Sequence, residues 1–198
     1  MRRGSHDDLV AELRAAVVAT LLLAVLCCGI YPALVWAVGQ GLFPGEANGS
    51  LVKVDGKVAG SSLLAQGFTA ANYFHPRPSA AGQGYDAGNS SGTNLGPTSK
   101  KLIEDVKRRV ADYRAENGLS SDTPVPADAV TSSASGLDPH IGVRNALLQA
   151  VRVAKARGIG EKELLAKVEA HTDGRTLGLL GEPRVNVLTL NLSLDGKL

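Results

Sequence analysis

The sequence predicts a single N-terminal transmembrane helix followed by one mixed α+β extracytoplasmic domain, so the fold class is α+β. Two observations lead to this prediction. A long apolar run without charge lies near the N-terminus, and the rest of the chain mixes helical periodicity with short β-prone segments. The predicted organisation is a short cytoplasmic N-terminus at 1–14, an anchor helix at 15–38, a Gly-rich linker at 39–50 and the extracytoplasmic domain at 51–198.

The anchor is predicted from the uncharged run Ala15–Val38. As a helix this run would be about 36 Å long, enough to cross a hydrocarbon core of about 30 Å. Trp36 near its end suits a membrane interface, and Pro32 should remove one helical hydrogen bond and kink the helix. A cleaved signal peptide is the alternative, but its apolar region is usually about 7 to 15 residues long. We therefore expect a retained anchor.

The flanking charges predict the orientation of the anchor. Arg2, Arg3 and Arg14 precede the apolar run, and no Lys or Arg follows it until Lys53. The positive-inside rule then keeps the N-terminus in the cytoplasm and places the domain across the membrane. In a bacterium this means a single-pass protein of the inner (plasma) membrane. Both cysteines of the chain lie inside the span, so no disulfide is expected in the domain.

Composition excludes one broad class of function. The formal net charge of the chain is only +2 at pH 7. A nucleic-acid binder needs a basic surface to neutralise phosphates, so nucleic acid is not an expected partner. A domain of about 150 residues can bury a core without cross-links.

The first half of the domain carries two clear local signals. Asp55-Gly56 is a favoured tight-turn pair between β-prone runs, which predicts a β-hairpin. A helix should begin after Thr98 or Ser99, which can cap it, and end at Gly118. Its predicted apolar stripe consists of Leu102, Ile103, Val106, Val110 and Tyr113.

The second half predicts two more helices and a strand. One helix is expected over Ile141–Arg157 and another over Glu161–His171, the latter with Leu164, Leu165 and Val168 inward. In the first of these, the predicted buried side consists of Ala146, Leu147, Ala150, Val151 and Ala154. Leucines then alternate with polar residues from Leu188 to Leu194, which predicts a half-buried C-terminal strand.

The segment YFHPRPSAAGQGYDAGNSSGTNLGPTS, residues 73–99, has the Gly, Ser, Asn and Pro content of a linker. It nevertheless keeps aromatic residues and leads directly into a capped helix, which a disordered tether would not usually do. We therefore expect an ordered polar surface. The sequence leaves open whether this surface is an internal scaffold or a docking face.

Short motifs were tested for chemistry. Gly88–Gly92 fits G-x-S-x-G around Ser90, but neither the strand nor the helix of a nucleophile elbow flanks it. Ser50 and Lys53 fit S-x-x-K, yet they enter a β-prone run instead of opening a helix. The four histidines are scattered without metal-ligand spacing, and no phosphate-binding loop is present. The sequence therefore predicts no catalytic residues, no metal site and no tightly bound cofactor.

Four blocks carry a resemblance to a known family. They are the segment of residues 73–99, PVPADAVTSSASGLDPHI, RVAKAR and GRTLGLLGEPRVNVLTLNLSL. With the membrane helix, they resemble the KdpC family, the small C subunits of bacterial Kdp potassium-transporting P-type ATPases. The match departs from the family at Leu64-Ala65 and over Gly142–Asn145, which puts local contacts in doubt but not membership.

The resemblance implies a role and a set of partners. Family members act with a potassium-translocating subunit, KdpA, a P-type ATPase subunit, KdpB, and a very small subunit, KdpF. They are regarded as non-catalytic accessory subunits needed for assembly and stabilisation, and as chaperones that raise the ATP affinity of the ATPase subunit. ATP acts on the complex, and nucleotide binds on the cytoplasmic side, so an indirect effect of this domain is the favoured interpretation.

The resemblance also implies candidate site residues. Gln149 matches a position where a nucleotide contact is suspected in the family, with a locally hydrogen-bonded helix residue as the alternative. The candidate partner-contact surface consists of Tyr73, Phe74, Arg77, Tyr85, Asp86, Ser90, Ser91 and Asn94. The rival functions are a membrane-anchored extracytoplasmic serine-type hydrolase and a free-standing binding module.

Overall fold

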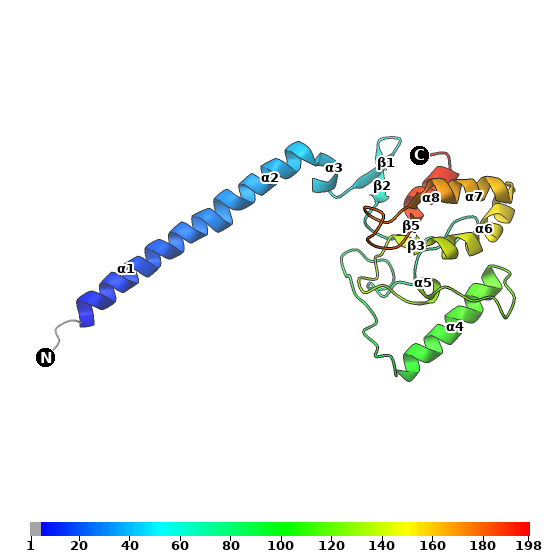
Figure 1. Cartoon of the computed structure of the whole chain (residues 1–198), viewed down its shortest axis with the longest axis horizontal. Coiled ribbons are helices and arrows are strands. Elements are labelled where there is room, and N and C mark those ends of the chain that lie inside the picture. The colour runs from blue at the N-terminus through cyan, green and yellow to red at the C-terminus, as the bar shows by residue number, and fades with distance from the viewer. Residues whose placement is uncertain (1–4) are drawn as a thin grey trace. The chain divides into compact units, whose positions relative to one another are not determined.

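The computed structural model describes residues 5–198, with side-chain surroundings from Asp8 onward. The chain divides into two compact units, Met1–Ser50 and Leu51–Leu198. The predicted mixture of helices and strands is confirmed (Figure 1).

The first unit is helical. It contains α1 (Ser5–Ala24), a π-helical turn η1 (Val25–Ile30), α2 (Tyr31–Leu42) and the short α3 (Pro44–Ala47). The stretch Asp8–Leu42 is long and apolar enough to cross a membrane, and none of its most apolar window is buried. Arg2 and Arg3, on which the predicted orientation partly rests, lie outside the described residues.

The helix has an irregular turn just before Pro32. The wider π-helical turn, Val25–Ile30, ends one residue before the α-helical segment that carries Pro32. Proline has no N–H for the carbonyl one turn earlier, and its ring crowds that carbonyl, so the backbone widens there. The helix thus carries a π-helical turn before Pro32, and the kink stays a prediction.

The second unit opens with the predicted hairpin. Strands β1 (Leu51–Val54) and β2 (Lys57–Ser61) pair in antiparallel fashion. Asp55 and Gly56 connect them with φ values of 49° and 75°. Positive φ at both central residues is what a two-residue hairpin turn requires, so this prediction is confirmed.

The predicted capped helix is also confirmed. It is α4 (Lys100–Glu116), and the Ser99 hydroxyl accepts a hydrogen bond from the Leu102 N–H. In the expected apolar stripe, Tyr113 is buried while Ile103 is exposed. The loop-rich stretch that follows holds one short helix, α5 (Ala127–Val130).

A small sheet organises the rest of the domain. Strands β3 (His140–Gly142), β4 (Thr172–Asp173) and β5 (Arg184–Asn186) pair in the order β3-β5-β4, and both pairings are antiparallel. Helices α6 (Val143–Arg157) and α7 (Glu161–Ala170) lie side by side between β3 and β4 in the chain (Figure 1).

The helix predicted over Ile141–Arg157 needs two corrections. It begins at Val143 because Ile141 belongs to β3. Its buried face carries Asn145 and Gln149, whereas Leu147 and Val151 are 44 % and 50 % exposed. Ala146, Ala150 and Ala154 are buried as predicted, and hydrogen-bonded amides, described below, share this inner face with them.

The predicted C-terminal strand is wrong beyond Asn186. Residues Val187–Leu194 form helix α8, and the Asn186 side chain caps it by accepting the Thr189 N–H at 3.2 Å. The alternating leucines suggested a strand with one buried face. However, the segment is buried on nearly all sides, through Val187, Leu188, Leu190, Asn191, Leu192 and Ser193. The alternation of leucine with polar residues therefore did not indicate which side of this segment contacts solvent.

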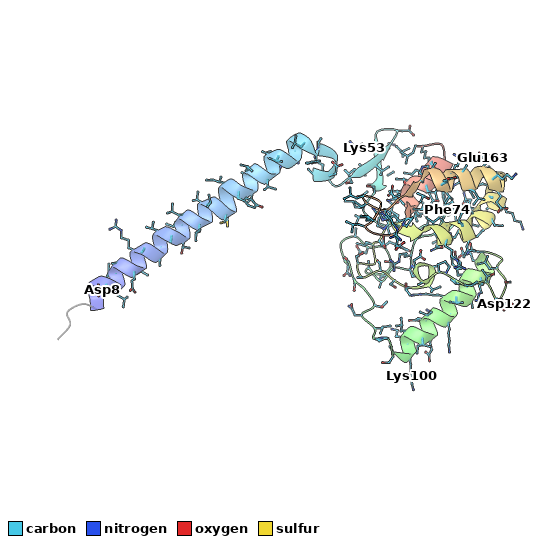
Figure 2. The ribbon with its side chains drawn as sticks, viewed as in Figure 1. Asp8, Lys53, Phe74, Lys100, Asp122 and Glu163 are labelled. Carbon is cyan, nitrogen blue, oxygen red and sulfur yellow. The ribbon has the colours of Figure 1, made fainter. Side chains whose placement is uncertain are left out.

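The core lies where α6, α7 and α8 meet the sheet. Its buried members are Phe74, Ile141, Ala146, Ala150, Val153, Ala154, Leu164, Val168, Val185, Val187 and Leu190. Phe74 comes from the segment of residues 73–99, which therefore contributes to the core (Figure 2).

Candidate functional site

The segment around Phe74 and His75 is held between two helices by side-chain amides. Asn191 on α8 accepts the Phe74 N–H at 2.8 Å and donates to the Phe74 carbonyl at 2.9 Å. Gln149 on α6 does the same for His75, at 2.7 Å and 3.1 Å. Successive residues of an extended chain direct their N–H and C=O groups to opposite sides, so the two amides act like neighbouring strands.

Gln149 uses its full hydrogen-bonding capacity. Besides the two bonds to His75, its Nε2 donates to Asn145 Oδ1 at 2.9 Å and its Oε1 accepts from Arg152 at 3.0 Å. An amide side chain has two donor hydrogens and room for two acceptor bonds, so no capacity remains for a ligand. A nucleotide could contact this amide only if these bonds were broken. The suspected nucleotide contact stays a prediction.

The network extends from Gln149 through α6 to α4. Asn145 donates to Asp128 at 2.9 Å, and its Oδ1 also accepts the Tyr113 hydroxyl at 2.8 Å. Burial raises the pKa of Tyr113, so the hydroxyl stays protonated and serves as a donor. Buried polar groups are stable only when they are paired, and this cluster meets that condition.

The amide network forms one wall of a cleft of about 300 Å³. Its lining includes Phe68, His75, Pro78, Tyr85, Arg109, Asp112, Tyr113, Glu116 and Gln149. The His75 ring lies 2.8 Å from a Glu116 oxygen. This hydrogen bond lowers the pKa of Glu116, burial partly opposes the shift, and the charges of His75 and Arg152 add to it.

The cleft combines two predicted site residues, Gln149 and Tyr85, but its charged groups are of both signs. Within residues 8–198, no group of three or more His, Cys, Asp or Glu residues is placed to hold a metal ion. Among these groups, His75 and Glu116 pair with each other at 2.8 Å. The arrangement favours a rigid interior over a site for one charged ligand.

Phe74 was predicted to lie on the partner-contact surface, but it lies in the core. Its side chain is 0 % exposed and packs in the core, and Figure 2 labels its position in the domain. The prediction that this side chain lies on a contact surface is wrong. The physical reason is its place between the two amide clamps, which direct the segment into the domain.

Tyr73 and Arg77 also have partners inside the domain. The Tyr73 hydroxyl donates to Asp195 at 3.0 Å, and the Arg157 guanidinium lies 4.9 Å from its ring centre. Arg77 pairs with Asp138 at 2.9 Å. Both side chains are half-buried, so only part of each is available to a partner.

Tyr85 and the serines fasten the rest of the segment. The Tyr85 hydroxyl donates to the Arg77 carbonyl at 3.0 Å, and a Cβ on Gly67 would lie only 2.9 Å from its ring. The Ser90 hydroxyl and the Ser91 N–H both donate to the Ser135 carbonyl, at 2.9 Å and 3.0 Å. The segment is thus ordered and serves largely as scaffold.

Three of the predicted contact residues remain exposed: Asp86, Ser90 and Asn94. Asp86 accepts the Gly88 N–H at 2.9 Å, and Asn94 has a φ of 50°. Their exposure is compatible with a partner contact. The predicted surface is therefore reduced to these three residues and the outer parts of its half-buried members.

The serine motifs lack the geometry of a nucleophile. An activated serine donates its proton to a base, whereas the Ser90 hydroxyl donates to a backbone carbonyl. Lys53 lies in strand β1, so Ser50 and Lys53 are not brought to one face as the first turn of a helix would bring them. This geometry gives no support to the hydrolase alternative.

Sequence reasoning missed several residues that build the site. Asn145, Asn191, Arg152 and Arg157 are central to its hydrogen bonds, and none was singled out. Arg152 donates to the carbonyls of Ala71 and Tyr73, at 2.6 Å and 3.1 Å. One usable signal was the spacing of two amides, Asn145 and Gln149, four residues apart inside an apolar helix.

Acid should weaken the domain through Asp138. Burial raises the pKa of this carboxyl, but hydrogen bonds from His140 and Arg77 outweigh burial and lower the pKa to about 2. Because the folded-state pKa is depressed, the stabilisation is present above pH 4 and is lost as pH falls toward 2. We expect the thermal midpoint to fall less steeply over this range in Asp138→Asn than in the unmodified chain.

The matched control for this prediction is Glu104→Gln on the exposed side of α4. It should leave the slope of the thermal midpoint against pH unchanged. An identical slope in Asp138→Asn and the unmodified chain would contradict the assignment.

Comparison with known proteins adds an independent finding. The family described as "KdpC: K+-transporting ATPase, c chain" matches residues 13–196. A potassium-transporting ATPase KdpC subunit of Nitratidesulfovibrio vulgaris is 56 % identical over 184 residues, covering 92 % of this chain and 93 % of the relative. The subunit of the same description from Mycobacterium tuberculosis is 55 % identical, covering 93 % and 97 %. That of Myxococcus xanthus is 56 % identical, covering 94 % and 86 %.

Proposed function

This chain belongs to the KdpC family, the c chain of K+-transporting ATPases, and from that premise we propose that it is a non-catalytic accessory subunit. In this role it assembles and stabilises a complex of a KdpA-like potassium-translocating subunit, a KdpB-like P-type ATPase subunit and a small KdpF-like subunit. The supporting observation is a membrane-helix candidate followed by a domain in which buried amide side chains form internal hydrogen bonds.

The proposed location is the bacterial inner membrane, with the N-terminus in the cytoplasm and the domain on the outer side. The excess of arginine before the apolar helix supports this orientation. The apolar stretch Asp8–Leu42 is long enough for one crossing.

The proposed effect on ATP is indirect. Family members are described as raising the ATP affinity of the ATPase subunit, and nucleotide binds that subunit on the cytoplasmic side. A domain on the outer side can act only by stabilising a conformation of the complex, which is a population shift without a shared site. The saturated hydrogen bonding of Gln149 supports this choice over direct contact.

Omission of the chain tests the proposal. We expect purified complexes assembled without it to lose most potassium-stimulated ATPase activity and to lose subunits during gentle solubilisation. Adding back the full chain should restore both. Full activity and an intact assembly without the chain would contradict an assembly role. Labelling of Ser90 by a serine-reactive probe, absent in Ser90→Ala, would instead favour the hydrolase alternative.

A further inference from the structure

The connection between β4 and β5 carries the three most exposed leucines of residues 51–198. Leu177, Leu179 and Leu180 are 88 %, 79 % and 63 % exposed. We call residues 174–183 the leucine hairpin. Large apolar side chains scattered singly on a surface are ordinary, but three gathered at the tip of one loop mark an interaction site.

The leucine hairpin is an ordered projection. Thr176 and Leu180 exchange backbone hydrogen bonds of 2.9 Å and 3.0 Å, which form a separate antiparallel bridge beyond the pairing of β4 and β5. Arg175 closes the base of the loop with two bonds to the Glu182 carboxylate, of 2.8 Å and 2.7 Å. An ordered loop presents its leucines with little loss of conformational entropy on binding.

The backbone at the tip would suit a polar residue better. Leu177 has a φ of 55°, in the left-handed region that glycine and asparagine adopt readily and leucine adopts rarely. A leucine at this position costs local stability and exposes apolar surface to water. Both costs are offset if the side chain is buried in a partner.

The charged and aromatic content of the leucine hairpin distinguishes a protein partner from a lipid partner. Loops that insert into lipid usually carry basic and aromatic residues, which bind anionic headgroups and the membrane interface. The leucine hairpin contains no Lys, Phe, Trp or Tyr, and its Arg175 is paired with Glu182. At its base Arg184 lies 3.8 Å from Asp173. Such a tip is complementary to a neutral apolar cavity in a protein.

One more exposed leucine lies near the base of the leucine hairpin. Leu63, 59 % exposed, shares a shallow pocket with Asp173 and Arg184 at the base of the hairpin. The segment of residues 73–99, in contrast, uses many of its polar groups within the domain. The leucine hairpin and Leu63 therefore offer the more suitable docking surface.

We propose that the leucine hairpin docks into an apolar cavity on another subunit of the potassium-transporting ATPase. This inference rests on the proposed function, since it requires a complex in which the chain is a subunit. Burial of the three leucines would then supply a large part of the free energy that retains the chain in the complex.

A triple variant tests the docking. Leu177→Asn, Leu179→Gln and Leu180→Gln are combined in the full tagged chain, and its apparent affinity for the remaining subunits is measured in mild detergent. We expect at least a tenfold loss, equivalent to about 1.4 kcal/mol. The control Val151→Gln removes an apolar side chain that is 50 % exposed on α6 and should change the affinity less than about twofold.

Folding is checked separately. Asparagine suits the positive φ at position 177, so Leu177→Asn alone should keep the thermal midpoint of the domain within about 3 °C. This single variant should still weaken retention measurably. Unchanged retention in both the single and the triple variant would overturn the inference, while the proposed function would stand.

A photo-crosslinking residue at position 179 identifies the occupant. A crosslink to another subunit of the purified ATPase supports the inference. Crosslinks to lipid alone, to a second copy of this chain, or to no neighbour overturn it. If the unmodified chain itself retains no other subunit, the proposed function fails, which is a different result from loss in the variants alone.

Discussion

Replacing Phe74 with alanine is expected to lower the free energy of unfolding of the domain by about 3–5 kcal/mol. The ring is fully buried in the core, so truncation loses its apolar transfer energy and leaves a cavity between the helices. Urea unfolding of the full chain in detergent, followed by far-ultraviolet circular dichroism, measures the change. This is a large fraction of the stability of a typical domain, about 5–15 kcal/mol.

The control for Phe74 is Ile103→Ala on α4. Ile103 is 45 % exposed, and alanine is the better helix former, so the stability should change by less than about 0.5 kcal/mol. If Phe74→Ala instead left the domain stable and weakened retention of the other subunits, Phe74 would be a contact residue after all.

Gln149→Leu is expected to destabilise the domain by about 2–4 kcal/mol. Leucine is close to glutamine in size, so the loss comes from polar groups that each lose one hydrogen-bond partner. The N–H and C=O of His75, the Asn145 Oδ1 and the Arg152 guanidinium each lose a hydrogen bond. An unsatisfied buried polar group costs about 1–3 kcal/mol, and partial rearrangement reduces the sum.

This variant also separates the two interpretations of Gln149. Thermal unfolding of the chain and the ATP dependence of the assembled ATPase are measured together, with Gln83→Ala at an exposed position as the control. A structural role predicts a lower thermal midpoint. A stable domain with a weakened ATP dependence would support the nucleotide contact in place of the structural role.

Elements with local determinants could be predicted from the sequence. The Ser99 cap and the apolar stripe specify α4, and Asp55-Gly56 specifies the hairpin, because the residues that decide these structures are close in the chain. The apolar run of the first unit is equally local. For these elements propensity and tertiary structure agree.

Elements whose burial depends on distant segments could not be predicted in the same way. The alternating leucines of α8 have neighbours on nearly all sides, so an alternating pattern did not identify a strand. On α6 the inner face carries Asn145 and Gln149, whose partners come from other parts of the chain. No local pattern shows that an amide will be paired, so in the amide network only Gln149 was anticipated, and in the cleft only Gln149 and Tyr85.

The amide clamps have a consequence for the order of folding. Phe74 and Asn191 are 117 residues apart, and His75 and Gln149 are 74 residues apart. Contacts over such separations form slowly, because long loops must close first. Until α8 is synthesised, the backbone around Phe74 lacks its partner on that helix and can pair with other chains. The domain can therefore complete its folding only after α8, its last helix, has been made.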